Sequence, residues 1–61
     1  MILKKGSLGK EVKELQEFLG TGADGIFGSG TEASVKNWQK NNGLTADGIV
    51  GPATWDAMGL A

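Results

Sequence analysis

The chain has 61 residues with no cysteine and no histidine, and its six lysines against seven acidic residues give a formal net charge of -1. One small domain of about 60 residues buries only about 60% of the unfolded surface, and here neither disulfides nor the usual zinc ligands can support it. The charge argues against nucleic-acid partners, and the lack of an apolar run of about 20 residues argues against membrane insertion. We expect a monomeric domain over 1–61 that needs no metal or cofactor.

The first predicted element is a helix over about residues 8–19. Ser7 can cap its start, and Gly20 can end it in a left-handed conformation. Its apolar residues recur at the spacing of one helical face. They are Leu8, Val12, Leu15 and Leu19.

A turn follows at Asp24-Gly25, because aspartate can accept hydrogen bonds from the following backbone and glycine tolerates a positive φ. Ile26 and Phe27 are then predicted to insert their side chains between the helices. The second helix is predicted over about 29–41, with Gly28 as its cap.

Thr31, Val35 and Trp38 give the second helix its periodicity, and Asn41-Asn42-Gly43 supplies a polar stop. Asp47-Gly48 repeats the earlier turn and is followed by Ile49 and Val50, which we expect to behave like Ile26 and Phe27. A short third helix is predicted from Pro52, with Gly51 as its cap, until Gly59.

An internal repeat organises these elements. The pattern DGIxGxxT occupies 24–31 and returns 23 positions later at 47–54, and Gln16 and Gln39 keep the same register. The chain is therefore two helix-and-turn units followed by a truncated third. This organisation predicts an all-α, compact three-helix bundle with two DGxxGxxT turn-helix repeats and little or no sheet.

The combination of GSLGKEVKELQEFL, DGIFGSGTEASVKNWQKNNGL and DGIVGPATWDAM resembles the type 1 peptidoglycan-binding domain family over nearly the whole chain. The resemblance implies a noncatalytic module that anchors an attached cell-wall hydrolase or transpeptidase to bacterial peptidoglycan. It also implies an extracellular or periplasmic, wall-associated location. Residues 1–5 do not have the charge order of a secretory signal, so we expect either an export signal elsewhere in a longer parent chain or export by another route.

Residues that occur in both repeats are interpreted as scaffold. Asp24 and Asp47 could suggest the paired carboxylates of a glycosidase, but each begins the same turn, which favours a structural role. Gln16 and Gln39 are expected to bond loop backbone through their side-chain amides. The same interpretation applies to the cap and turn residues Gly25, Gly28 and Thr31. Trp38 stands where the first repeat has Leu15, and its place on the apolar stripe favours a core position over a ligand platform.

Residues that differ between the repeats are the better candidates for a site. Trp55 stands where the first repeat has Glu32, and it either presents its ring to a sugar or rotates inward to fill the core. Amides at the start of the third helix could receive a carboxylate of a stem peptide. The predicted ligand-binding set is completed by the second turn and by the polar end of the second helix. It comprises Asp47, Gly48, Gly51, Thr54, Lys40, Asn41 and Asn42, in addition to Trp55.

Two rival functions stay open at this level. One is a spacer or pro-domain that packs on its own enzyme, because the same fold resembles the matrix metalloproteinase pro-domain; the absence of cysteine argues against the zinc-blocking form of that role. The other is a small cell-wall hydrolase, which lacks support because no nucleophile and base pair is evident.

Overall fold

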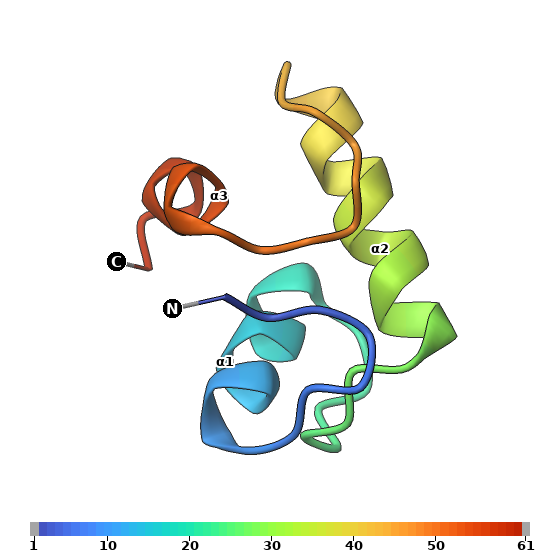
Figure 1. The fold of residues 1–61 in the computed structure, drawn as a ribbon. Coiled ribbons are helices and arrows are strands. Elements are labelled where there is room, and N and C mark those ends of the chain that lie inside the picture. Colours follow the sequence, from blue (N-terminus) through green and yellow to red (C-terminus); the bar gives the residue numbers. More distant parts are fainter. Residues whose placement is uncertain (1, 61) are drawn as a thin grey trace.

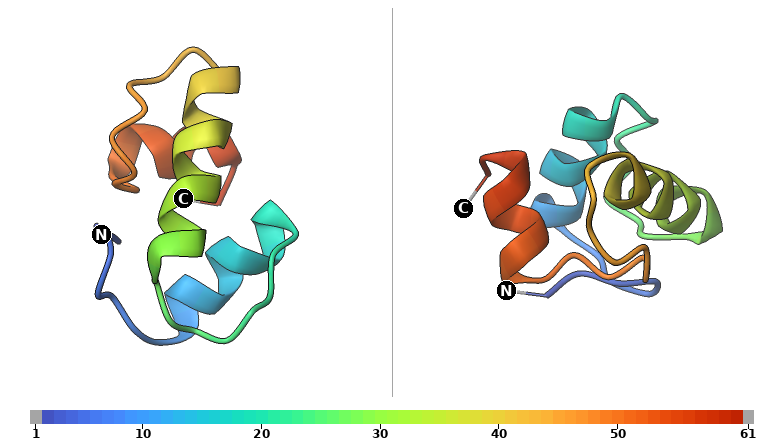
Figure 2. Two further views of the ribbon diagram at one scale, coloured as in Figure 1. Left: turned by 90° about the vertical axis from the view of Figure 1, so that its right-hand side faces the viewer. Right: turned by 90° about the horizontal axis from the view of Figure 1, so that it is seen from above.

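Residues 2–60 are described by a computed structural model in which three helices pack around one small core. The helices are α1 (Lys10–Leu19), α2 (Ser29–Asn41) and α3 (Pro52–Met58). In Figure 1, α2 runs along one side of the molecule and α1 and α3 face it from the other, and both views of Figure 2 agree with this arrangement. The predicted all-α fold is confirmed, since the only strand-like pairing among these residues is two isolated bridges.

The bounds of α2 and α3 agree with the predicted ones, but α1 begins two residues later than expected. Ser7 does not cap it, because the Ser7 hydroxyl accepts a hydrogen bond from the Lys4 amide and Gly9 is the capping residue. The Ser7 carbonyl accepts from the Phe27 amide and the Gly9 amide donates to the Gly25 carbonyl. These bonds to the neighbouring loop hold residues 7–9 out of the helix.

The N-terminal segment runs antiparallel to both repeat loops. Leu3 pairs with Val50, and Leu8 pairs with Ile26, each in a single antiparallel bridge. Leu8 is therefore held in the bridge and is 70% exposed, which corrects its predicted place on the apolar face of α1.

The hydrophobic core draws on every part of the chain. Its buried members are Leu3, Val12, Leu15, Phe27, Val35, Val50, Trp55 and Met58. Phe27 and Val50 are inserted as predicted, whereas Ile26 and Ile49 are exposed, which corrects that part of the prediction. Adjacent side chains of an extended segment point to opposite sides, so only one of each pair can enter the core.

Two of the glycines between α2 and α3 offer a matched test of this packing. Gly43 and Gly48 both have positive φ, 71° and 76°, but a Cβ on Gly43 would meet nothing within 4 Å. A Cβ on Gly48 would lie 2.9 Å from Cγ of Glu32 and 3.1 Å from Cε of Lys36. Both substitutions by alanine strain the backbone by about 1–2 kcal/mol.

We expect Gly48→Ala to destabilise the domain by about 1 kcal/mol more than Gly43→Ala, because the Glu32 and Lys36 side chains have to move. Urea denaturation of the two variants measures this difference. Equal losses would show that these side chains give way without cost.

Candidate functional site

The first repeat is closed by the side chain of Gln16, which is 1% exposed. Its Nε2 donates to Oδ1 of Asp24 at 2.9 Å, to the Ile26 carbonyl at 2.9 Å and to Oγ1 of Thr31 at 3.0 Å. Its Oε1 accepts from the Gly25 amide at 2.9 Å. The side-chain amide of Gln16 thus links α1 to the loop at residues 24–26 and to Thr31 near the start of α2.

The second repeat contains the same bonds around Gln39, which is also 1% exposed. Nε2 of Gln39 donates to Oδ1 of Asp47 at 3.1 Å, to the Ile49 carbonyl at 2.9 Å and to Oγ1 of Thr54 at 3.2 Å. Oε1 accepts from the Gly48 amide at 3.0 Å. The expected bonds from both glutamines to loop backbone are therefore present, and each loop is fixed before the helix that follows it.

The two turn aspartates carry a distinct electrostatic signature. The Ile26 amide donates to Asp24, and with the Gln16 side chain it lowers the pKa of Asp24 below its ordinary value of 3.8. The Ile49 amide does the same to the pKa of Asp47; burial opposes this shift, and the Gln39 side chain adds a smaller lowering effect. Both carboxylates therefore favour the ionised form in the folded state.

This shift predicts the pH dependence of stability. A lowered folded pKa means that the stabilisation is complete above 3.8 and is lost as the pH falls from 3.8 through the lower pKa of the folded state, because the unfolded chain takes up protons first. We expect the urea midpoint to fall over that window. Asp24→Asn and Asp47→Asn should each remove part of this decrease in the urea midpoint, and the double variant should remove most of it. If the double variant shows the same decrease as the parent, other titrating groups cause the pH dependence.

Two grooves flank the start of α3. The first, here called the loop groove, has a volume of about 330 Å³ and lies between the loop after α2 and the first residues of α3. It is lined by Gln39, Leu44, Thr45, Asp47, Ile49, Gly51, Pro52, Ala53 and Thr54. Asp47, Gly51 and Thr54 from the predicted ligand-binding set therefore share one surface, with Gly48 buried next to Asp47 in the chain.

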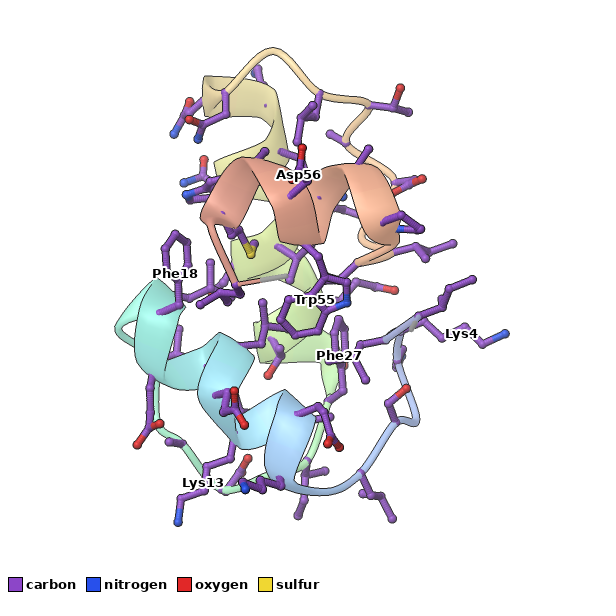
Figure 3. The ribbon with its side chains drawn as sticks, turned by 90° about the vertical axis from the view of Figure 1, so that its left-hand side faces the viewer. Lys4, Lys13, Phe18, Phe27, Trp55 and Asp56 are labelled. Carbon is purple, nitrogen blue, oxygen red and sulfur yellow. The ribbon has the colours of Figure 1, made fainter. Side chains whose placement is uncertain are left out.

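The second groove, here called the helix groove, is an open depression of about 810 Å³ between α1 and α3. It is lined by Glu11, Glu14, Pro52, Ala53, Trp55, Asp56 and Leu60. Figure 3 shows the ring of Trp55 between these two helices, with Asp56 above it on the outer side of α3. Pro52 and Ala53 belong to both grooves, so the grooves meet at the first turn of α3.

Of the two alternatives that the sequence left open for Trp55, the structure shows the inward one, because the ring belongs to the core. Trp55 is 8% exposed, and it also lines the helix groove. Its Nε1 is buried and has no hydrogen-bond partner among the described residues. An unpaired buried donor costs about 1–3 kcal/mol, so an acceptor that reaches this nitrogen would recover part of that free energy.

Other predicted residues lie away from the grooves. Lys40, Asn41 and Asn42 are exposed at the end of α2 and line neither groove, and the Asn42 side chain donates to the Trp38 carbonyl. Trp38 is only partly buried, and its ring packs edge to face on Phe18 with centroids 5.7 Å apart. The sequence placed Trp38 in the core, whereas the structure places it at the edge of the core, packed against the buried cluster.

The sequence reasoning missed the acidic and apolar residues of the helix groove. Glu11 and Glu14 are three apart on α1 and so share a face, which is the signal that could have suggested them. Asp56 lines the same groove from α3, and that depends on how α3 packs on α1. Within residues 2–60, no group of three potential ligands could hold a metal ion, and no helix has the length and apolar character to cross a membrane.

Comparison with known proteins gives a consistent result. Residues 8–58 match the family described as "Putative peptidoglycan binding domain". The chain is 47% identical, over 92% of its length, to the zinc D-Ala-D-Ala carboxypeptidase of Streptomyces albus G, and 44% identical, over all of its length, to a probable N-acetylmuramoyl-L-alanine amidase of Bacillus licheniformis. It spans 25% and 20% of the lengths of these two relatives.

A solved structure shares the fold closely. The peptidoglycan-binding protein of Clostridioides difficile, in complex with glutamine hydroxamate, superimposes with a TM-score of 0.93 at 48% identity. The match covers 97% of this chain and 40% of that protein.

Proposed function

The chain belongs to the peptidoglycan-binding domain family, a domain found in cell-wall hydrolases and peptidases, and on that premise we propose that it is a noncatalytic module that anchors an attached wall enzyme to peptidoglycan. The attached enzyme then meets its substrate at a raised local concentration. The proposal includes an extracellular or periplasmic location at the wall. It also places the parent protein's chemistry in a part outside these residues.

The observation that carries the site is the meeting of the two grooves at the start of α3. The lining residues Pro52, Ala53 and Trp55 are those in which the second repeat departs from Ser29, Gly30 and Glu32 of the first. Both repeats keep the glutamine, aspartate and threonine that fix the loop. Ligand contact is therefore assigned to the residues that the shared scaffold does not require.

The affinity of one such module is expected to be modest. The surface is open, so it buries little of a ligand, and the gain has to offset the lost motion of both partners. Both a glycan strand and a stem peptide fit a surface of this kind. The loop groove offers backbone and hydroxyl groups, and the helix groove offers apolar and acidic side chains.

Two alanines on α3 provide the test. Ala53 lines both grooves, whereas Ala57 lies in neither, and both side chains are exposed. We expect Ala53→Gln to weaken binding to purified sacculi about tenfold, which corresponds to about 1.4 kcal/mol of lost contact, while Ala57→Gln binds like the parent. Cosedimentation with sacculi, together with circular dichroism of both variants, measures this.

The same preparation separates the rival functions. Failure of the parent chain to bind sacculi would reject the anchoring role and favour a spacer that packs on its own enzyme. Release of soluble muropeptides by the isolated 61 residues would instead show hydrolysis. Equal binding by the two glutamine variants would keep the anchoring role and reject the site at the start of α3.

A further inference from the structure

We propose that the helix groove binds a primary ammonium group on an aliphatic arm, of the kind that a diamino acid in a peptidoglycan stem peptide carries when its side-chain amine is free. This inference rests on the proposed function and names the part of the ligand that this groove recognises. It predicts preference for stem peptides whose amine has not been acylated by a cross-link.

The charge of the groove is the first observation. Glu11 and Glu14 from α1 and Asp56 from α3 line it, and no lysine is among the lining residues. The one ion pair within residues 2–60 joins Glu32 to Lys36 at 4.0 Å, on another part of the surface. The three groove carboxylates therefore have no lysine partner and attract a cation.

The second observation is the buried Trp55 indole nitrogen, which has no hydrogen-bond partner in a side chain that is only 8% exposed. In Figure 3 the edge of the ring that carries this nitrogen faces the end of α3 at which the helix begins, between α3 and α1. An indole N–H group does not bind a cation. It donates a hydrogen bond to a carbonyl or carboxylate oxygen. A ligand that satisfies the groove therefore carries both a cation and a nearby acceptor.

The apolar lining fixes the class of cation. Pro52, Ala53 and Leu60 supply aliphatic surface between the charged groups. Among the described residues no three carboxylates are close enough together to hold a metal ion. An ammonium group on a carbon chain, attached to a peptide whose carbonyls serve as acceptors, meets all three requirements.

Two soluble peptides test the proposal. A stem tetrapeptide with a free side-chain amine is compared with the same peptide acetylated at that amine, in titrations of the isotope-labelled chain followed by NMR. We expect acetylation to weaken binding about tenfold, because it removes the charge that the carboxylates attract. The Trp55 indole N–H signal should shift with the free-amine peptide, and the Trp38 indole signal, outside the groove, serves as the internal control.

A pair of glutamates on α1 gives the matched variants. Glu14 lines the groove and Glu17 does not, and both are exposed. Glu14→Gln should weaken binding of the free-amine peptide about threefold and leave the acetylated peptide unaffected, whereas Glu17→Gln should change neither. Equal affinity for the two peptides, or equal behaviour of the two variants, would overturn the proposal.

Sacculi separate this inference from the function on which it rests. Chain that binds native and amine-acetylated sacculi equally well retains the anchoring role and refutes ammonium recognition. Absence of binding to either preparation rejects the anchoring role, and the inference with it. Loss of binding on acetylation alone supports both.

Discussion

Gln39→Ala is expected to destabilise the domain by about 4 kcal/mol, a large part of its total stability. A domain of 61 residues has a stability of about 3–9 kcal/mol. The substitution removes the acceptor of the buried Gly48 amide and the two N–H hydrogens that Asp47, the Ile49 carbonyl and the Thr54 hydroxyl share. Each unsatisfied buried group costs about 1–3 kcal/mol, and the space left by the side chain adds to the loss, so we expect about 4 kcal/mol in total.

Gln39→Glu isolates the hydrogen-bond contribution, because it keeps the shape of the side chain. It retains the acceptor for the Gly48 amide but places a carboxylate oxygen against Oδ1 of Asp47, 3.1 Å from the original Nε2. We expect a large loss of stability at neutral pH and partial recovery on acidification, when the new carboxyl regains a hydrogen to donate. Circular dichroism during urea denaturation measures both variants.

Lys40→Ala is the control for Gln39, since it changes the adjacent exposed residue of α2 and should alter stability by no more than about 0.5 kcal/mol. Gln16→Ala should resemble Gln39→Ala, because its bonds are the same in the first repeat. A loss below about 1 kcal/mol in Gln39→Ala would show that these bonds contribute little to holding the loop.

Trp55→Ala is expected to destabilise the domain by about 3–5 kcal/mol, the usual cost of removing a buried aromatic ring. Trp55 is 8% exposed and belongs to the core cluster. Trp55→Phe keeps most of the ring but removes the unpaired N–H group. The smaller ring packs less well, which destabilises the domain, but the cost of burying an unpaired donor also disappears, which offsets part of that loss. We expect the phenylalanine variant to stay folded with a loss of less than about 2 kcal/mol.

These two variants also decide how the role of Trp55 in binding is measured. Loss of sacculus binding in Trp55→Ala does not by itself assign a binding role to the ring, because this variant also loses core packing. Trp55→Phe separates the contributions, because it preserves the fold while it removes the only donor that the ring offers to a ligand. A Trp55→Ala variant as stable as the parent by urea denaturation would contradict the core position of the ring.

Much of the fold was predictable because its determinants are local. The bounds of α2 and α3, the left-handed Gly20, and the positive φ of Gly25 and Gly48 follow from residues that lie within a few positions of each feature. Recurrence of Gln16 and Gln39 in register indicated that their amides would bond the loops, and the hydrogen bonds are there. The start of α1 was misplaced because its determinant, the pairing of residues 7–9 with the loop at 25–27, is remote in the chain.

The sequence by itself determined the helices, the turns and the glutamine bonds, since hydrogen bonding over short stretches depends on which donors and acceptors lie at fixed spacings. Only the tertiary structure decided what equivalent positions do. Glu32 and Trp55 both occupy the fourth position of their helices, yet Glu32 lies over Gly48 while Trp55 is buried where α3 faces α1. Burial of a helix position depends on which other part of the chain packs over it, and the fourth positions of α2 and α3 pack against different parts of the chain. The acidic lining of the helix groove arises in the same way, from two helices whose contact no local pattern records.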